Sequence, residues 1–287
     1  MKITKELIDE ALDFYRIDDP DYVRLCHECV DEIKDDEKAL SHVKALCDVI
    51  FTHDALEERA KYGAMTRDEI FPGIKSPYIF NIAFFSGIHM HKENIKKLGF
   101  DDYQIEKHRF RPHNTLTIHP EGALFATVRW ASLYVRGDII EIGSLQFERD
   151  EHVFGKDIKY PNLHVHIPAK VDFSPEAVSR SLKDGREASD RYYGKEYHDR
   201  YCESWLLDPY LKTVLPETSN IISFQNRFDV YDIKRDGKED VLNFLFKAKP
   251  DCDLNALPED TSLRRKMKAA LLRGDRLSLG KGKLIEE

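Results

Sequence analysis

The sequence has no apolar run approaching the roughly 20 residues that span a bilayer, and no charged start followed by an apolar signal segment. Its first residues, MKITKELIDEALDFY, instead show the pattern of an amphipathic helix. Cysteine is also scarce, because the 287 residues contain only five, an odd number that is widely scattered. This usage does not fit a disulfide framework, so we expect a cytoplasmic protein without disulfide bonds.

Internal repeats, low-complexity segments and a net positive charge are absent as well. The formal charge of −8 at pH 7 argues against a general nucleic-acid binder. The charge is uneven: residues 1–60 hold 8 Lys and Arg against 17 Asp and Glu, whereas residues 262–287 hold 8 against 3. Two interpretations of the basic end stay open, a contact with a phosphorylated ligand or a solvated helix face.

What the sequence does contain, first of all, is helical periodicity. Apolar residues recur every three or four positions over residues 3–60, and Gly63 and Pro72 then interrupt the pattern. Residues 78–88 are mostly apolar and fit a buried helix or a strand, while 89–98 with Gly99 behind them indicate a helix and its C-cap. We predict a mainly helical N-terminal domain over residues 1–115.

The pattern then changes to one typical of β-structure. Two runs rich in branched and aromatic residues, 124–135 and 138–148, flank Arg136-Gly137-Asp138 and are predicted to form an antiparallel hairpin. Further strands are predicted at 162–167, 201–205, 220–232 and 276–284, and helices at 174–193, 208–215, 240–246 and 262–273. The fold class is therefore α+β: a helical domain followed, over residues 116–287, by a mixed, mostly antiparallel sheet flanked by helices.

One strand, loop and helix in this order could hold a phosphate group. The strand LHVHIPA leads through a short loop into a helix that opens with Ser174, Pro175, Glu176 and Ala177. Ser174 is a suitable N-cap, proline suits the first helical position, and the amides of the first turn attract anions. The alternative is an ordinary capped helix that binds nothing, which is common in α/β proteins.

Several stretches taken together resemble a bacterial GNAT-like acyltransferase family. They are WASLYVRGDIIEIGSLQFER, LHVHIP with its SPEA helix, CESWLLDPYLKTVLPETSNIISFQNRF and LPEDTSLRRKMKAALLRGDRLSLGKGKL. The resemblance covers residues 130–284 and implies a helical N-terminal domain, a GNAT-like C-terminal domain and acetyl-CoA or another acyl-CoA as donor. The glycine-rich pyrophosphate loop of mainstream GNAT enzymes, of the type Q/R-x-x-G-x-G/A, is replaced here by Ala169-Lys170-Val171-Asp172-Phe173.

The resemblance also implies which residues hold the donor. Backbone amides at the end of the strand, near Ile167, would hold the thioester carbonyl oxygen, and the loop with the first helical turn would hold the pyrophosphate. The expected donor-binding residues are Ile167, Ala169, Phe173, Ser174, Glu176 and Ala177.

Acyl transfer to an amine needs a base for the ammonium group, a stabilised oxyanion and a protonated leaving thiolate. His164 and His166 lie two residues apart and hence on one face of their strand, and we favour His166, which is nearer the loop, as the base. Glu203 on the adjoining strand is an alternative base or a group that orients the ammonium, provided that strands 162–167 and 201–205 separate. Tyr210 matches the place where many GNAT enzymes keep a tyrosine that protonates the thiolate. For each residue a purely structural role stays open.

The signals for a metal site, a redox site or a cysteine nucleophile are weaker in the sequence. Cys26 and Cys29 have the spacing of a zinc or redox site but lie inside a helical stripe without a second cysteine pair, and Cys202 in a strand fits the core better than a nucleophile. The histidines 89, 91, 108, 113 and 119 lack the spacing of a catalytic zinc site, so we expect no metal.

Two functions thus remain. The first is an acyl-CoA-dependent acyltransferase that acts on a small-molecule or peptide amine. The second is a catalytically silent GNAT-like module that binds a ligand or a protein partner in the cleft between its domains, which the altered loop favours. We expect neither nucleic acid nor a membrane as partner. An oligomer stays open, because an apolar strand such as 220–232 fits a core or a dimer edge.

Overall fold

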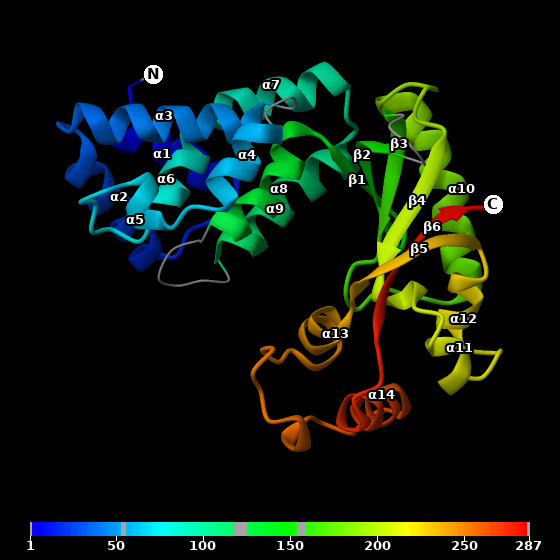
Figure 1. Cartoon of the computed structure of the whole chain (residues 1–287). Helices are drawn as coiled ribbons and strands as arrows, with labels where there is room; N and C mark the ends of the chain where they lie inside the picture. Colours follow the sequence, from blue (N-terminus) through cyan, green and yellow to red (C-terminus); the bar gives the residue numbers. More distant parts are fainter. Residues whose placement is uncertain (1, 53–55, 118–124, 154–158, 286–287) are drawn as a thin grey trace. The chain divides into compact units, whose positions relative to one another are not determined.

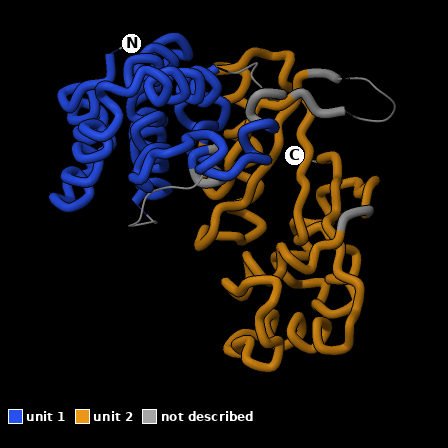
Figure 2. The backbone as a smooth tube through the Cα atoms, turned by 60° about the vertical axis from the view of Figure 1, so that its left-hand side comes forward, with its two compact units in different colours: residues 1–140 blue, residues 141–287 orange. Residues whose placement is uncertain are grey.

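The computed structural model describes residues 2–52, 56–117, 125–153 and 159–285 (Figure 1). The chain forms two compact units, unit 1 over residues 1–140 and unit 2 over residues 141–287 (Figure 2). Among the described residues, no helix combines the length and the apolar character that crossing a membrane requires.

As far as Arg136, the described residues of unit 1 form helices and their connections. The helices are α1 (Lys5–Phe14), α2 (Pro20–Ile33), α3 (Glu37–Phe51), α4 (Leu56–Gly63), α5 (Arg67–Ile70), α6 (Ile79–Phe85), α7 (Ile88–Leu98), α8 (Asp102–Thr117) and α9 (Phe125–Arg136). The first three begin at side chains that accept a hydrogen bond from the first turn, namely Thr4, Asp19 and Asp36. The predicted helical start of the chain is therefore confirmed.

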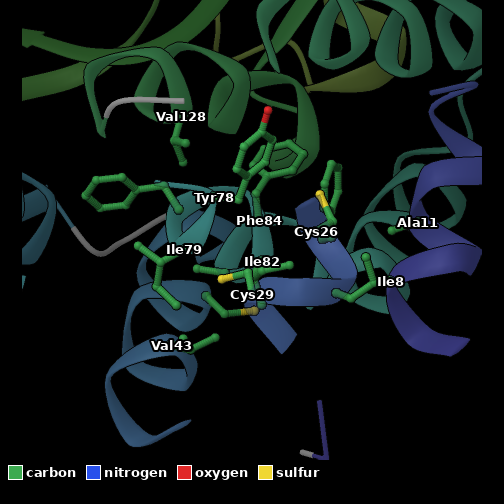
Figure 3. Packing of buried hydrophobic residues seen from close by; sticks show 14 of the residues in the cluster. Ile8, Ala11, Cys26, Cys29, Val43, Tyr78, Ile79, Ile82, Phe84 and Val128 are labelled. Atoms are coloured by element: carbon green, nitrogen blue, oxygen red, sulfur yellow. The ribbon is translucent and has the colours of Figure 1, made fainter. Parts of the chain in front are cut away.

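The core of unit 1 surrounds α6, every residue of which is buried. Figure 3 shows Ile82 and Phe84 of this helix among side chains from α1, α2, α3 and α9. Cys26 and Cys29 belong to the same core, and burial raises the pKa of both thiols, that of Cys29 to about 12. The interpretation of these two cysteines as core residues is confirmed, since a protonated, buried thiol is a poor metal ligand or redox group.

The predicted strand at 124–135 is wrong. Residues 125–136 form the helix α9, and residue 124 lies outside the described part of the chain. Val128, Ala131 and Val135 are all fully buried at helical spacing, so this face packs into the core despite the branched and aromatic residues around it. Gly137 then adopts a φ of +71°, which ends the helix instead of turning a hairpin.

The described residues between 139 and 284 form a sheet of six strands in the order β1-β2-β3-β4-β6-β5, which lies mainly in unit 2. The strands are β1 (Ile139–Ile142), β2 (Leu145–Val153), β3 (Lys159–His166), β4 (Asp199–Ser204), β5 (Phe228–Asp236) and β6 (Ser278–Leu284). The β3-β4 pair is parallel, whereas the β2-β3, β4-β6 and β5-β6 pairs are antiparallel. A mixed, mostly antiparallel sheet was predicted, and the strands at 162–167, 201–205 and 276–284 are confirmed.

The helix α10 (Pro175–Tyr192) covers one face of this sheet (Figure 1). A Cβ atom built on Gly185 would lie 2.3 Å from Cζ of Phe147, so the helix backbone rests directly on that ring. Arg200 of β4 donates a hydrogen bond of 2.7 Å to the carbonyl oxygen of Leu182 from the same face. Small residues in α10 therefore allow the close packing that the sequence indicated.

The remaining elements of unit 2 form a smaller lobe with its own apolar cluster. They are η1 (Trp205–Leu207), α11 (Leu211–Val214), α12 (Asn220–Gln225), α13 (Lys238–Asp240), the π-helix η2 (Val241–Phe246), η3 (Leu254–Ala256) and α14 (Ser262–Arg273). The predicted strand at 220–232 is wrong in its first half, because Ser219 caps a short helix and the strand begins only at Phe228.

Candidate functional site

The face of the sheet opposite α10 carries a row of polar side chains. Alternate residues of a strand point to the same face, and the register of the strands aligns these residues across four of them. The row, called the polar face below, consists of Glu148 and Asp150 of β2, His164 and His166 of β3, Tyr201 and Glu203 of β4, and Lys281 and Lys283 of β6.

Strands β3 and β4 separate beside this row. Their parallel pairing covers three residue pairs, the last of which joins His164 to Tyr201. Beyond that point β3 stays paired with β2 as far as His166, and β4 stays paired with β6 as far as Ser204. The backbone N–H of Glu203 lies in this opening and donates to Nε2 of His164 over 3.3 Å. The separation that the proposed roles of His166 and Glu203 require is thus present.

His166 is held by a carboxylate that sequence reasoning missed. Its Nε2 lies 2.7 Å from Oε2 of Glu148 on the neighbouring strand, and the side chains of His166 and Glu148 are 20% and 21% exposed. A carboxylate only accepts, so the imidazole nitrogen carries the hydrogen in this contact. The pattern Leu145-Gln146-Phe147-Glu148 alternates apolar and polar residues, and this alternation was the available signal that Glu148 faces the same way as the histidines.

His164 has a different environment. Its ring stacks on that of Tyr201 with centroids 4.4 Å apart and planes 16° apart, and it lies 4.0 Å from the ring of His166. Its Nδ1 is 3.9 Å from Oε2 of Glu148. Because Nε2 accepts from Glu203, the neutral ring carries its hydrogen on Nδ1.

The same three side chains, Glu148, His164 and His166, are close enough to hold a metal ion, since their ligand atoms lie within 4.8 Å of one another. A metal on Nδ1 of His164 would force the hydrogen onto Nε2, against the N–H of Glu203. Hydrogen bonding within the group accounts for the cluster, so the donor set does not argue for a metal.

The other charges of the polar face are paired. Lys281 lies 3.2 Å from the carboxylate of Glu203, and Lys283 lies 2.9 Å from that of Asp199. Tyr201 donates its hydroxyl hydrogen to Asp150, and burial together with this carboxylate raises the pKa of Tyr201, which keeps the phenol protonated at neutral pH. Glu203 is therefore already engaged by an ammonium group, whereas His166 faces a carboxylate.

Tyr210 belongs to a separate set of contacts. It precedes α11, donates its hydroxyl hydrogen to Asp275 over 2.8 Å and accepts from Arg273 over 3.0 Å. Burial and the carboxylate of Asp275 raise the pKa of Tyr210. The phenol keeps its proton at neutral pH, but that proton points at Asp275.

The loop before α10 uses up several amides that a phosphate group would need. Ser174 caps the helix as predicted, accepting from the amide of Ala177, and its own amide donates to Asp172 over 3.0 Å. The first helical residue is proline, which has no N–H. Hydrogen bonding from Ser174 lowers the pKa of Asp172, so an ionised carboxylate stands in the loop just before the helix, whose first turn contains the exposed Glu176.

The remaining predicted donor-binding residues lie along this loop. Ile167 directly follows β3 and is half-buried, and Ala169 is exposed. Phe173 packs against Phe224 of α12 with ring centroids 5.1 Å apart. The structure thus places all six on one continuous strand end, loop and first turn, and their role in binding stays a prediction.

Two cations of the basic C-terminal region, Arg264 and Lys268 of α14, bind backbone groups within the smaller lobe. Arg264 donates to the carbonyl oxygen of Leu245 over 3.1 and 2.9 Å, and Lys268 donates to the carbonyl oxygens of Asn255 and Leu257 over 2.7 and 2.9 Å. They satisfy backbone groups at the ends of short helices, so their contacts are structural.

The fold described above matches a known family. The family described as GNAT-like C-terminal domain matches residues 139–284, which is half of the chain and includes the whole sheet and α10. The chain belongs to this GNAT-like family. The resemblance seen in the sequence is confirmed, and the GNAT-like domain follows a helical unit as expected. A search of curated protein sequences gives no significant match.

Solved structures similar to the chain extend beyond the GNAT-like domain. An acyltransferase in complex with decanoyl-CoA superposes with a TM-score of 0.73 at 20% identity, over 96% of this chain and 86% of that one. An acyltransferase mutant in complex with octanoyl-CoA gives 0.74 at 21% identity, over 98% and 88%. A third, in complex with decanoyl-CoA and teicoplanin, gives 0.72 at 22% identity, over 96% and 86%. At these identities the similarity establishes the fold, including the helical unit.

Proposed function

We propose that the protein transfers an acyl group from acyl-CoA to an amine. The observation that carries this proposal is the polar face where β3 and β4 separate, since a histidine held by a carboxylate stands there within a GNAT-like domain. The similar structures with decanoyl-CoA and octanoyl-CoA support the donor, and they favour a medium-length acyl chain over acetyl.

We assign the steps of the acyl transfer to residues of this chain. His166 takes a proton from the acceptor ammonium, the neutral amine attacks the thioester carbonyl carbon, and backbone amides after β3, near Ile167, stabilise the oxyanion. A C–N bond forms, the nitrogen loses its second proton to solvent, the C–S bond breaks, and the thiolate of coenzyme A leaves with a proton. Tyr210 is our candidate for that proton, which requires its hydroxyl to turn from Asp275.

The acceptor we propose is an amine on a peptide-like molecule. Two similar structures are acyltransferases in complex with teicoplanin and with 10C-Teicoplanin, which is compatible with a bulky acceptor. Glu203, already paired with Lys281, is better suited to orienting an ammonium group than to removing its proton.

The test is a transfer assay with decanoyl-CoA and a panel of amines, in which release of the thiol and the mass of the product are both measured. We expect His166→Ala to lower kcat by about 100-fold or more, and Glu203→Gln to act mainly on the KM of the amine. The exposed Glu239→Gln in α13 serves as the matched control. Activity that survives both His166→Ala and Glu203→Ala would show that neither residue is the base.

A second candidate is a silent GNAT-like module that binds a ligand or a protein partner. It is favoured by the start of α10, where Asp172 and Ser174 occupy amides that a pyrophosphate would use. Such a module would bind acyl-CoA weakly or not at all, and would release no thiol with any amine.

A further inference from the structure

The contact between Glu148 and His166 is selective. The register sets Glu148 directly opposite His164, and directly opposite residues lie closer than diagonal ones. Yet Oε2 of Glu148 is 2.7 Å from His166, the diagonal neighbour, and 3.9 Å from His164. The carboxylate therefore passes its nearest histidine to bind the next one.

The neighbours of His164 explain this choice. Its ring is fixed on one side by stacking on Tyr201 and at Nε2 by the N–H of Glu203. Both contacts anchor His164 to β4, so this histidine bridges the strands where their pairing ends. His166, two residues further along β3, lies beyond the last β3-β4 pair and receives the carboxylate instead.

We propose that Glu148 is the positioning residue of the base, and this inference rests on the proposed acyl transfer. By accepting the hydrogen of Nε2, Glu148 fixes the imidazole of His166 in the form whose lone pair is on Nδ1. Nδ1 is then the atom that takes the proton of the acceptor ammonium. The positive charge formed on the ring is stabilised by the carboxylate 2.7 Å away, in a setting where both groups are mostly buried.

The proton balance is simple. The acceptor R–NH₃⁺ loses one proton to Nδ1, and His166 becomes an imidazolium that keeps its Nε2 hydrogen on Glu148. Once the C–N bond has formed, the nitrogen releases a second proton to solvent, and Tyr210 recovers from solvent the proton that it gives to the thiolate as the C–S bond breaks. The imidazolium then returns the first proton to solvent. In this scheme Glu148 exchanges no proton with the substrate and acts only through the hydrogen bond that it accepts from His166.

Two substitutions separate the contribution of the Glu148 hydrogen bond from that of its charge. Glu148→Leu is similar in size but accepts no hydrogen bond, whereas Glu148→Gln keeps an acceptor oxygen and loses the charge. We expect kcat to fall about 10- to 100-fold in Glu148→Leu and by less in Glu148→Gln, with the KM for acyl-CoA unchanged in both. In the His166→Ala background, Glu148→Leu should cost almost nothing more, because the two residues act as a unit. Glu239→Gln is again the control.

A second readout does not depend on activity. In protein labelled with ¹⁵N-histidine, the Nε2 hydrogen of His166 should be slow to exchange and visible by NMR, and its assignment follows from its loss in His166→Ala. We expect this signal to persist in Glu148→Gln and to disappear in Glu148→Leu. The signal from the Nδ1 hydrogen of His164 should remain in both variants, which shows that β3 is intact.

The outcomes distinguish the two proposals. If the wild type transfers no acyl group but the Nε2 signal depends on Glu148, the proposed function fails and the pairing stands as a structural contact only. If transfer occurs and Glu148→Leu leaves kcat unchanged, or if its loss adds fully to that of His166→Ala, the positioning role is wrong. A failure of Glu148→Leu to fold leaves the Glu148→Gln kinetics and the wild-type spectrum to decide.

Discussion

Lowering the pH should destabilise unit 1 through one buried histidine. His91 in α7 is completely buried, its Nδ1 lies 2.7 Å from the hydroxyl of Tyr15, and its Nε2 has no hydrogen-bond partner within the described chain. Burial lowers the pKa of His91 well below its ordinary value of 6.5, and the nearby His108 and Lys92 lower it further. Protonation would place an unpaired charge in the core.

The direction in which the stability changes with pH follows from proton linkage. Below pH 6.5 the unfolded chain binds a proton at His91, whereas the folded chain does not until the pH is much lower. The stability associated with neutral His91 is thus fully present above pH 6.5 and is lost as the pH falls toward the lowered folded pKa. In that interval the free energy of unfolding should fall with a limiting slope of about 1.4 kcal/mol per pH unit for this one proton.

The assay uses the two tryptophans, of which Trp130 lies in unit 1 and Trp205 in unit 2. A Trp205→Phe background reports urea unfolding of unit 1 by fluorescence at a series of pH values. His91→Phe removes the titrating group and keeps an aromatic ring beside Tyr15. The free energy of unfolding of this variant should therefore fall less steeply with decreasing pH, by up to about 1.4 kcal/mol per pH unit. An equal pH slope with and without His91 would refute the reasoning.

Two further predictions concern unit 2. Gly185→Val should destabilise the fold by about 1–3 kcal/mol in chemical denaturation, because its Cβ would meet the fully buried ring of Phe147. The control Glu187→Ala, at an exposed position in the same helix, should be nearly neutral. Asp172→Asn keeps the acceptor for the amide of Ser174 and removes the charge, so it should tighten coenzyme A binding about two- to five-fold at low salt and less at high salt. Asp184→Asn, exposed in the middle of α10, should leave the affinity unchanged.

The elements with strong local signals were predictable. Ser174 and Pro175 specify where α10 begins, and Gly274, with a φ of +74°, ends α14 where the sequence indicated. Both signals depend on one or two residues and on backbone geometry alone. Neighbouring parts of the fold do not alter them.

The incorrect or missed predictions concern segments whose structure depends on tertiary packing. The stretch before Gly137 is rich in residues typical of strands, yet its buried positions repeat at helical spacing and join a helical core. The register between β2 and β3, which brings Glu148 to His166, is a long-range property. The sequence therefore indicated the histidines, whereas their carboxylate partner required the structure.

Calorimetric titration of the folded protein with decanoyl-CoA and with coenzyme A tests the central claim, a GNAT-like acyl-CoA site, most directly. The account predicts saturable one-to-one binding of both, with decanoyl-CoA the tighter because its chain buries additional apolar surface. No heat of binding with either compound, from protein whose fold is verified by circular dichroism, would contradict the account and leave the silent binding module as the better explanation.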